Sequence, residues 1–332
     1  MYLGGGTPTL LPSASIAALL DRVRSRFGIA SDAEVTIEAN PGPDERGHAM
    51  TLAGLGVTRL SMGAQSFDPA LLRRLGRRHR PSDIADAVRE ARDGGIASVS
   101  VDLLYDVPGQ SVDAFAASLD AAIELCVDHV SAYALTLDDP DAEGITGPTG
   151  DHLPTTRGAR RWRDGARIEQ DDDRAADQYR LAVDRLGAAG FRGYEISNWA
   201  RAGHESRHNL AYWTREPYEA VGPGAHAFDG VTRRWNTARL DAYLAALAPS
   251  TGAPSLPPGD AEPVDEAGAA VESVILALRL DEGLSDGDAE SGPLAPLLPW
   301  GFEHGLLERV ADRIRLTTDG RLLSNELFSR LV

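Results

Sequence analysis

The amino-acid sequence predicts an α/β protein in which a parallel sheet is wound with helices. Short β-rich runs alternate with amphipathic helical segments from residue 1 to about 140. The connections are short, and the run from Ser98 to Leu104 has the apolar face expected of a parallel sheet. Because crossovers between parallel strands are right-handed, two architectures stay open: a doubly wound open sheet and a (β/α) barrel.

Each element of this first part has a local reason. Ser13 can cap a helix that runs to Phe27, because apolar residues follow it at helical spacing. A strand at 34–39 ends at Asn40-Pro41-Gly42, and later units end at glycines in the same way. We expect further strands at 57–62, 98–104 and 129–137, and further helices at 44–55, 68–75, 82–93 and 112–125. Only Tyr2-Leu3 precedes the first glycine run, so the chain begins near the end of a strand.

The second part reads as a loop, one more β/α unit and a separate C-terminal unit. Residues 139–170 are typical of a surface loop, 173–190 predict a helix, 194–197 a strand and 198–235 a polar loop. Residues 249–263 are proline-rich and read as a linker. Helices at 267–280, 302–307 and 322–331 with a hairpin at 310–316 indicate a small winged-helix-like unit. The expected domains are therefore 1–248 and 264–332, joined by 249–263.

Composition excludes several classes of protein. The 33 basic and 50 acidic residues give a net charge of −17, which argues against sequence-independent binding to nucleic acid or an anionic membrane. The single cysteine excludes a disulfide framework within the chain. No apolar run is long enough to span a membrane, and the N-terminus lacks the features of a signal peptide. We expect a cytoplasmic protein without membrane insertion.

Candidate binding residues follow the predicted strands. Gly4-Gly5-Gly6-Thr7 lies between a strand and a helix, where glycines let backbone groups approach a ligand. Glu38, Gln65 and Asp102 lie at or near strand ends. Arg77 follows Gln65, on the next helix. In a barrel such positions converge on the mouth. Together they would suit a ligand that carries amine, hydroxyl and carboxylate groups.

The order and spacing of several motifs resemble a known family. They are Gly-Gly-Gly-Thr-Pro-Thr, Glu-Ala-Asn-Pro, Ser-Met-Gly-Ala-Gln-Ser-Phe, Leu-Gly-Arg-Arg-His and Asp-Leu-Leu-Tyr-Asp-Val-Pro-Gly-Gln. This set is similar to the radical S-adenosylmethionine (SAM) proteins of the coproporphyrinogen dehydrogenase, or HemN-like, group. The stretch His208-Asn209-Leu210-Ala211-Tyr212-Trp213 resembles the His-Asn-x-x-Tyr-Trp motif of the HemW-type haem chaperones. The resemblance runs from residue 3 to the C-terminus, where it implies a HemN-type domain.

The resemblance implies a fold, ligands and partners. The fold would be a partial (β/α)6 barrel that here lacks its first β-α unit. Haem and client haemoproteins would be the partners, with membrane-associated respiratory haemoproteins among the clients. The implied SAM-binding residues are Gly5, Gly6, Thr7, Glu38, Gln65, Arg77 and Asp102. The implied haem-binding residues are His208, Asn209, Tyr212 and Trp213, with His208 as a ligand of the haem iron.

One family feature is missing from the sequence. The family binds a [4Fe–4S] cluster through Cys-x-x-x-Cys-x-x-Cys, and this chain has no such motif, which we interpret as an N-terminal truncation. Cys126 is expected to be a small buried apolar residue rather than a ligand. His226 is a weaker candidate for haem. The alternative function is an oxygen-independent coproporphyrinogen III dehydrogenase, so enzymatic activity stays open.

Overall fold

The computed structural model describes residues 1–136, 165–247 and 257–332. Within them the chain forms two compact units. Unit 1 comprises Met1–Leu135 and Glu169–His208, and unit 2 comprises Thr136–Ile168 and Asn209–Val332. The proline-rich segment 249–256 and most of the predicted surface loop lie outside the described residues. The domain bounds inferred from the sequence remain a prediction.

Unit 1 is built on a seven-stranded sheet with the order β1-β2-β3-β4-β5-β7-β6. Strands β1 to β5 are parallel, whereas β7 is antiparallel to both β5 and β6. The mostly parallel α/β class is therefore confirmed. The strand bounds are β1 Tyr2–Leu3, β2 Thr36–Ala39, β3 Arg59–Gln65, β4 Ser98–Tyr105, β5 His129–Ala134, β6 Arg192–Gly193 and β7 Asn198–Ala200.

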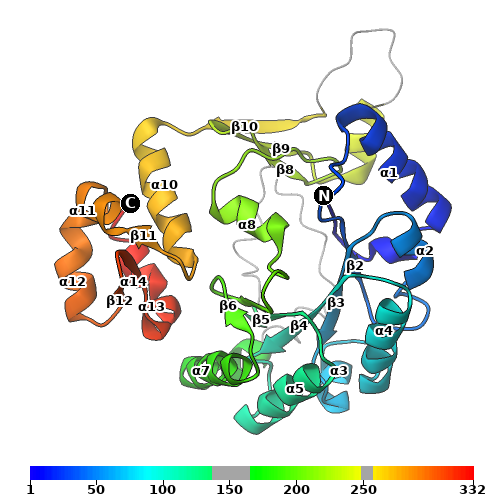
Figure 1. The fold of residues 1–332 in the computed structure, drawn as a ribbon, viewed down its shortest axis with the longest axis horizontal. Helices are drawn as coiled ribbons and strands as arrows, with labels where there is room; N and C mark the ends of the chain where they lie inside the picture. The colour runs from blue at the N-terminus through cyan, green and yellow to red at the C-terminus, as the bar shows by residue number, and fades with distance from the viewer. Residues whose placement is uncertain (137–164, 248–256) are drawn as a thin grey trace. The chain divides into compact units, whose positions relative to one another are not determined.

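Helices of unit 1 pack against the sheet at β4 and lie around its outer side in Figure 1. Most begin at a side-chain cap, as at α5, where Ser111 accepts from the Ala114 N–H. The bounds are η1 Pro8–Leu10, α1 Ser13–Phe27, α2 Ala49–Gly54, α3 Pro69–Arg74, α4 Pro81–Asp93, α5 Val112–Glu124 and α7 Asp172–Ala188. These bounds agree with the predicted helices except at α2.

The strands predicted at 57–62 and 129–137 are shifted or shortened to Arg59–Gln65 and His129–Ala134, and two further elements of unit 1 differ more strongly from their prediction. The helix expected at 44–55 begins only at Ala49, because Gly47 has a φ of +72° and His48 caps the helix by accepting from the Thr51 N–H. The strand expected at 194–197 is instead the turn between β6 and β7. Its Tyr194 is buried, so burial rather than sheet pairing explains the apolar pattern there.

The two faces of the sheet have opposite chemistry. The residues buried beside the helices are apolar, as in the alternating Leu60, Met62 and Ala64 of β3. The intervening residues are polar on every strand from β1 to β5, and also at Asn198 of β7. The interior of a (β/α) barrel is ordinarily filled by branched apolar side chains. This polar interior face is therefore a candidate ligand site rather than an apolar packed core. We call the following set the polar face: Tyr2, Thr36, Glu38, Arg59, Ser61, Ser98, Ser100, Asp102, His129, Ser131, Tyr133 and Asn198.

Unit 2 contains two three-stranded antiparallel sheets, in the orders β10-β9-β8 and β11-β13-β12. The last five residues of the predicted linker form β10, which pairs with β9. The C-terminal helices and hairpin enclose a core that includes Leu278, Ile314 and Leu327. The first two residues of α8 belong to unit 1 and the rest to unit 2. The bounds are α8 Arg207–Trp213, β8 His226–Phe228, β9 Thr232–Asn236, α9 Leu240–Ala246, β10 Gly259–Pro263, α10 Glu266–Arg279, β11 Leu284–Ser285, α11 Asp286–Ser291, η2 Ala295–Leu297, α12 Leu298–Glu303, β12 Leu307–Val310, β13 Arg313–Leu316, α13 Thr318–Leu322 and α14 Ser324–Phe328.

The winged-helix-like arrangement predicted for the C-terminus agrees with this core, although its helices start earlier than expected. The helix predicted near 302–307 is α12, and the one predicted at 322–331 is divided into α13 and α14. Among the described residues, the structure has no helix with the length and apolarity needed to cross a membrane.

Candidate functional site

The glycine turn after β1 is bound to a carboxylate on β2. The backbone N–H of Gly5 donates to Glu38 Oε2 at 2.9 Å, and Tyr2 Oη donates to Glu38 Oε1 at 2.5 Å. A Cβ on Gly4 would lie 2.5 Å from the Tyr2 ring and 3.0 Å from Glu38, so glycine is required at that position. Gly5 and Gly6 have φ values of +89° and +68°. The turn thus presents backbone next to a fixed carboxylate.

Asn40 connects the glycine turn to the ends of β2 and β3. Its amide donates to Thr7 Oγ1 at 2.9 Å, and its carbonyl accepts from Arg77 at 3.4 Å. A Cβ on Gly63 would lie 2.7 Å from Gln65 Nε2 and 3.5 Å from Asn40 Oδ1. Four predicted binding residues and Asn40 therefore lie around one rim: Gly5, Thr7, Gln65, Arg77 and Asn40.

Gln65 itself is held in an uncommon backbone conformation. Its φ is +64°, and the pairing of β3 with β4 shifts register between Met62 and Gln65. A bulge of this kind redirects a side chain at a strand end. The local strain is consistent with a position selected for a ligand rather than for the sheet.

Asp102 lies in the middle of β4 on the polar face. Ser61 Oγ lies 3.4 Å and 3.5 Å from its two carboxylate oxygens, and Ser131 also hydrogen-bonds to it. Burial raises the pKa of Asp102 to about 6, and the nearby Glu38 carboxylate adds to this effect. The hydroxyls of Ser131 and Ser61 and the charge of Arg59 act in the opposite direction. The polar face thus carries, next to Glu38, a buried carboxyl group whose proton affinity is raised.

The lower part of the polar face contains buried ionisable groups. Arg59 donates to Ser98 Oγ at 3.1 Å and is 3% exposed. His129 lies between Ser100 Oγ at 2.7 Å and Tyr194 Oη at 2.9 Å. Burial holds the pKa of His129 well below its usual range, and the charge of Arg59 adds to this effect. Arg59 thus places a buried cation on the polar face, nearer the start of the strands than Glu38 and Asp102.

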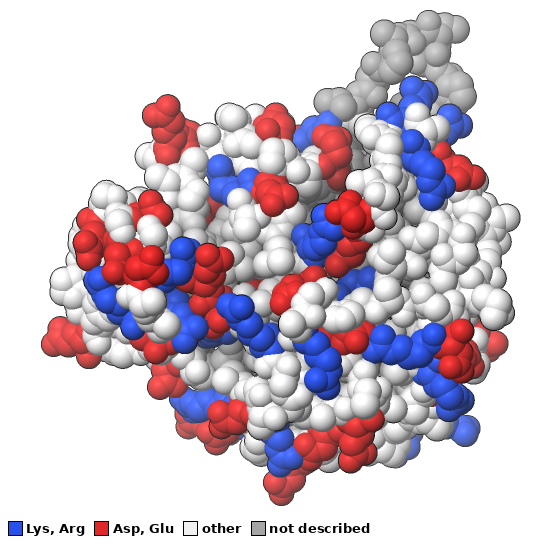
Figure 2. All heavy atoms as spheres, in the orientation of Figure 1, with Lys and Arg blue, Asp and Glu red and all other residues white. Residues whose placement is uncertain are grey.

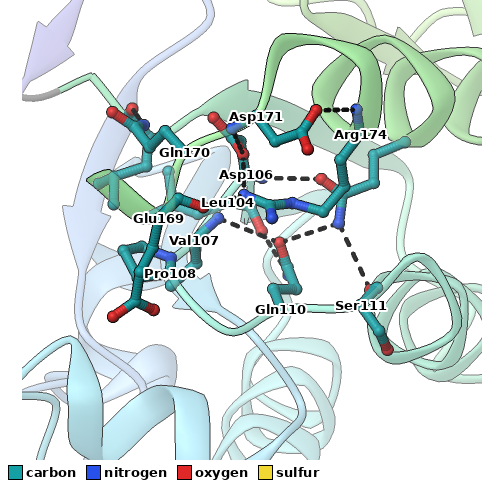
Figure 3. Close-up of polar contacts among 12 residues, drawn as sticks. Leu104, Asp106, Val107, Pro108, Gln110, Ser111, Glu169, Gln170, Asp171 and Arg174 are labelled. Atoms are coloured by element: carbon teal, nitrogen blue, oxygen red, sulfur yellow. Dashed lines mark hydrogen bonds and ion pairs between the residues drawn. The ribbon is translucent and has the colours of Figure 1, made fainter. Parts of the chain in front are cut away.

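A buried polar network fixes the loop that follows β4 (Figure 3). Asp106 has a φ of +52°, and its backbone N–H donates to Gln178 Oε1 at 2.9 Å. Its carboxylate pairs with Arg174 of α7 at 2.5 Å. Gln110 donates to the Leu104 carbonyl at 3.0 Å, so the amide of Gln110 closes the loop onto β4. These contacts attach the loop to β4 and to α7.

His208 stacks on Tyr2 within unit 1. The ring centroids are 4.2 Å apart and the planes differ by 15°. The carboxylate of Glu34 accepts from the backbone N–H groups of Arg207 and His208, both at 3.3 Å, at the start of α8. A carboxylate is favourable there because it pairs with N–H groups that have no partner within the helix. His208 is therefore joined through Tyr2 to Glu38.

The other predicted haem-binding residues belong to unit 2. Tyr212 packs edge-on against Tyr218, with ring centroids 4.6 Å apart. Trp213 lies under the guanidinium of Arg279, which is 5.3 Å from the ring centroid. Asn209 belongs to the same helix. His226 lies against Trp235, with ring centroids 6.0 Å apart. The structure therefore gives Tyr212 and Trp213 packing partners, whereas their role toward haem stays a prediction.

Sequence reasoning missed several residues of the site. The sequence indicates only a strand end at Tyr2, whereas the structure shows that its side chain contacts both Glu38 and His208. Asn40 and Gly63 were inside the quoted motifs but were not assigned a role. The sequence does carry a signal for both residues. Asn40 is a polar residue directly after a strand, and Gly63 is a glycine inside a strand, and both positions are unusual enough to indicate a specific role. Ser61 and Ser131 could be found only from the strand register.

A mostly parallel sheet with a glycine turn and several predicted binding residues at one rim agrees with the radical SAM class that the sequence motifs imply. The model of the radical SAM superfamily matches residues 1–122. A solved structure, the coproporphyrinogen III oxidase HemN of Escherichia coli, aligns with a TM-score of 0.78 over 99% of this chain and 76% of that chain, at 23% identity. This likeness shows the fold.

Two curated relatives show the family. The haem chaperone HemW of Mycobacterium tuberculosis is 41% identical over 335 residues, which cover 100% of this chain and 80% of the relative. The haem chaperone HemW of Bacillus subtilis is 31% identical over 99% of this chain and 84% of the relative. The chain belongs to the HemW family of haem chaperones, as the motif resemblance implied.

The residues present do not fit a [4Fe–4S] cluster held by three thiolates. The sequence has one cysteine, and the described residues contain no group of three or more side chains suited to hold a metal ion. The expectation that Cys126 is buried is wrong, since it is exposed. Its φ is +52°, and it forms the turn between α5 and β5, where the buried residue is Val127 instead.

Proposed function

We propose that this chain binds haem through His208 and delivers it to haemoproteins. The observation that carries the proposal is the placement of His208, which stacks on Tyr2 at the edge of the polar face. A histidine next to an aromatic ring suits an iron porphyrin, because imidazole is a common axial ligand and the ring adds apolar contact. Membership of the HemW family supports the same function.

A haem titration followed by the Soret band tests this proposal. We expect saturable binding by the full chain and at least about tenfold weaker binding by His208→Ala, since a metal–ligand bond is lost. His304→Ala is a matched control, because His304 is an exposed histidine of unit 2. Equal affinity of His208→Ala and the parent chain would exclude His208 as the ligand. His226→Ala then tests the second candidate.

Transfer is a separate property from binding. The haem-loaded chain should convert an apo-haemoprotein such as apomyoglobin to its holo form faster than free haem dissociation alone permits. We propose haemoproteins of the respiratory chain as the physiological clients and the cytoplasm as the place of loading. Membrane vesicles that contain an apo-respiratory haemoprotein would test the client class, and cell fractionation would test the location.

We also propose that the rim around Asn40 binds SAM. Arg77 would bind the methionine carboxylate through its guanidinium, while Glu38, Gln65 and Asp102 would bind amine and hydroxyl groups. Gly5, Gly6 and Thr7 would contribute the close backbone surface. Where a cluster is bound as well, SAM would supply radical chemistry. Here the proposal concerns binding only, and equilibrium dialysis with labelled SAM tests it, with Glu38→Gln and Arg77→Gln expected to weaken binding.

The alternative is an oxygen-independent coproporphyrinogen III dehydrogenase. The curated relatives that cover the chain are haem chaperones, so they favour the first function. The discriminating measurement is product analysis, because only the dehydrogenase would yield protoporphyrinogen from coproporphyrinogen.

A further inference from the structure

Arg59 is a buried cation that has no carboxylate partner among the described residues. On the face drawn in Figure 2, acidic and basic side chains are interspersed. Exposed arginines such as Arg89 and Arg309 form ion pairs with nearby carboxylates. Arg59 is 3% exposed, and its hydrogen bonds within the described chain go only to neutral oxygens. Because the burial of an unpaired charge is costly, the charge of this side chain needs a reason.

The contacts of Arg59 explain its position but not its charge. Among the described residues, only Nη1 of the guanidinium has hydrogen-bond partners. It donates to Ser98 Oγ at 3.1 Å and to the His204 carbonyl at 2.8 Å. A neutral amide is also a donor for such oxygens, so these bonds do not require a cation. The other guanidinium nitrogens are left for a ligand.

The carboxylates of the polar face lie further along the strands. Arg59 pairs in register with Thr36, and Glu38 is two residues beyond it, about 7 Å along β2. Arg59 also pairs with Ser98, and Asp102 is four residues beyond that, about 13 Å along β4. Burial raises the pKa of Asp102 more than the charge of Arg59 lowers it. Neither carboxylate is therefore a direct counter-ion of Arg59.

A buried hydroxyl without a partner lies next to Arg59. The strand register aligns Tyr2, Thr36, Arg59 and Ser98 in one row across β1 to β4. Thr36 is 0% exposed, and its Oγ1 has no hydrogen-bond partner among the described residues. Buried hydroxyls are nearly always hydrogen-bonded, so this one indicates a missing ligand atom. A cation and an unsatisfied hydroxyl on adjacent strands, about 4.8 Å apart, suit one anion.

The segment 204–208 contacts this row at two points. The His204 carbonyl accepts from Arg59, and the His208 ring stacks on Tyr2. The unsatisfied hydroxyl belongs to the strand between these two contacts. The row is thus shielded from bulk water, and hydrogen bonds to an ion are stronger in such surroundings than in water.

We propose that Arg59 and Thr36 bind one carboxylate-type oxyanion. The guanidinium donates to the anion through its nitrogens that have no partner in the protein, and the Thr36 hydroxyl donates a further hydrogen bond. A water molecule would satisfy the hydroxyl but not the charge. The carboxylate comes from a free anion of the size of formate or from a propionate of haem, and only the second source rests on the proposed haem binding.

Thermal unfolding of the full chain tests for a free anion. Sodium formate is compared with sodium chloride at the same ionic strength, so that general screening is equal in both. We expect formate to raise the Tm of the parent chain in a saturable manner. Arg59→Gln should raise the formate concentration at half saturation at least about tenfold, because a charge-assisted hydrogen bond is lost.

Thr36→Val separates anion binding from the stability of the fold. Its hydroxyl has no partner in the described chain, so the variant should be no less stable than the parent in chloride. Its half-saturation concentration for formate should rise about fivefold, since one hydrogen bond to the anion is lost. Thr58→Val is the matched control, because Thr58 Oγ1 accepts from the Val35 N–H at 2.9 Å. It should lower the Tm in both salts and leave the half-saturation concentration unchanged.

Titration with haem and with its dimethyl ester tests the second source of the carboxylate. If a propionate occupies the site, the parent chain binds haem more tightly than the ester, and Arg59→Gln and Thr36→Val both remove this preference. A parent chain that binds neither porphyrin contradicts the proposed haem function, and the formate response then decides the anion site alone.

The proposal is overturned if the two variants match the parent in both experiments. Equal formate responses would assign any effect of formate to the protein surface, and an equal preference for haem over its ester would place the propionates elsewhere. If Arg59→Gln does not fold, Thr36→Val decides the outcome, because its substitution removes no contact within the described chain.

Discussion

The ring of Tyr2 stacks on the imidazole of His208, with centroids 4.2 Å apart and planes 15° apart. The same side chain donates its hydroxyl proton to Glu38 at 2.5 Å. One residue thus links the predicted iron ligand to the predicted SAM site. The link is made of two separable contacts, a ring stack and a hydrogen bond, so each can be removed alone.

The ring stack and the hydrogen bond of Tyr2 should make additive contributions to the free energy of unfolding. Tyr2→Phe keeps the ring and loses the hydrogen bond, so we expect the free energy of unfolding to fall by about 1 kcal/mol. Tyr2→Ala should lose about 0.5–1.5 kcal/mol more for the stack, besides the buried ring area. Urea unfolding of both variants, each with and without His208→Ala, measures the coupling. A coupling energy of zero between Tyr2→Ala and His208→Ala would show that the stack contributes nothing.

The raised pKa of Asp102 predicts a stability gain in a variant that loses function. The folded pKa of about 6 lies above the ordinary value of 3.8, so ionisation destabilises the fold as the pH rises through this interval. The penalty is absent below pH 3.8 and complete above pH 6, where it is as much as about 3 kcal/mol. Asp102→Asn should therefore be more stable than the parent above pH 6.

The gain from Asp102→Asn should vanish near pH 4, and SAM binding should be lost throughout. Thermal unfolding between pH 4 and 8 measures the difference. Asp93→Asn is a suitable control for the substitution itself, because Asp93 is exposed on α4. A pH-independent effect of Asp102→Asn would mean that its carboxyl group is ionised without penalty.

The buried His129 predicts a loss of stability in mild acid. Its folded pKa lies below the ordinary 6.5, so the unfolded chain takes up a proton that the folded protein does not. Stability should fall as the pH drops below 6.5, by up to about 1.4 kcal/mol per pH unit from this residue. His129→Gln should flatten that part of the profile. The remaining slope would come from other histidines, such as His79, whose pKa is also lowered by burial.

The Arg174–Asp106 pair should contribute far more than an exposed ion pair. Arg174→Gln leaves the buried Asp106 carboxylate without its cation, so we expect a loss of about 2–3 kcal/mol. Arg89→Gln breaks the exposed pair with Asp86 on α4 and should change stability by less than about 0.5 kcal/mol. Chemical denaturation of both variants decides the matter. Equal effects would show that the loop after β4 does not depend on this pair.

The predictable parts of the fold were those with local causes. The helix at Ser13–Phe27 and the strand at Ser98–Tyr105 follow from side-chain spacing that acts within one element. Residues 194–197 have the pattern of a strand but form a turn, because Tyr194 is buried by packing and not by sheet pairing. The late start of α2 depends on the φ of Gly47, which the helical pattern around it conceals.

The sequence alone determined the α/β class, the family motifs and the identity of the charged groups, because these depend on residue type and short spacing. Only the tertiary structure decided which of those groups meet. The strand register places Glu38, Ser61 and Asp102 on one face of the sheet. The fold also brings His208 against Tyr2, although the two residues are 206 positions apart in the sequence. The proton affinity of Asp102 and His129 also required the fold, since burial is a property of surroundings that no single segment specifies.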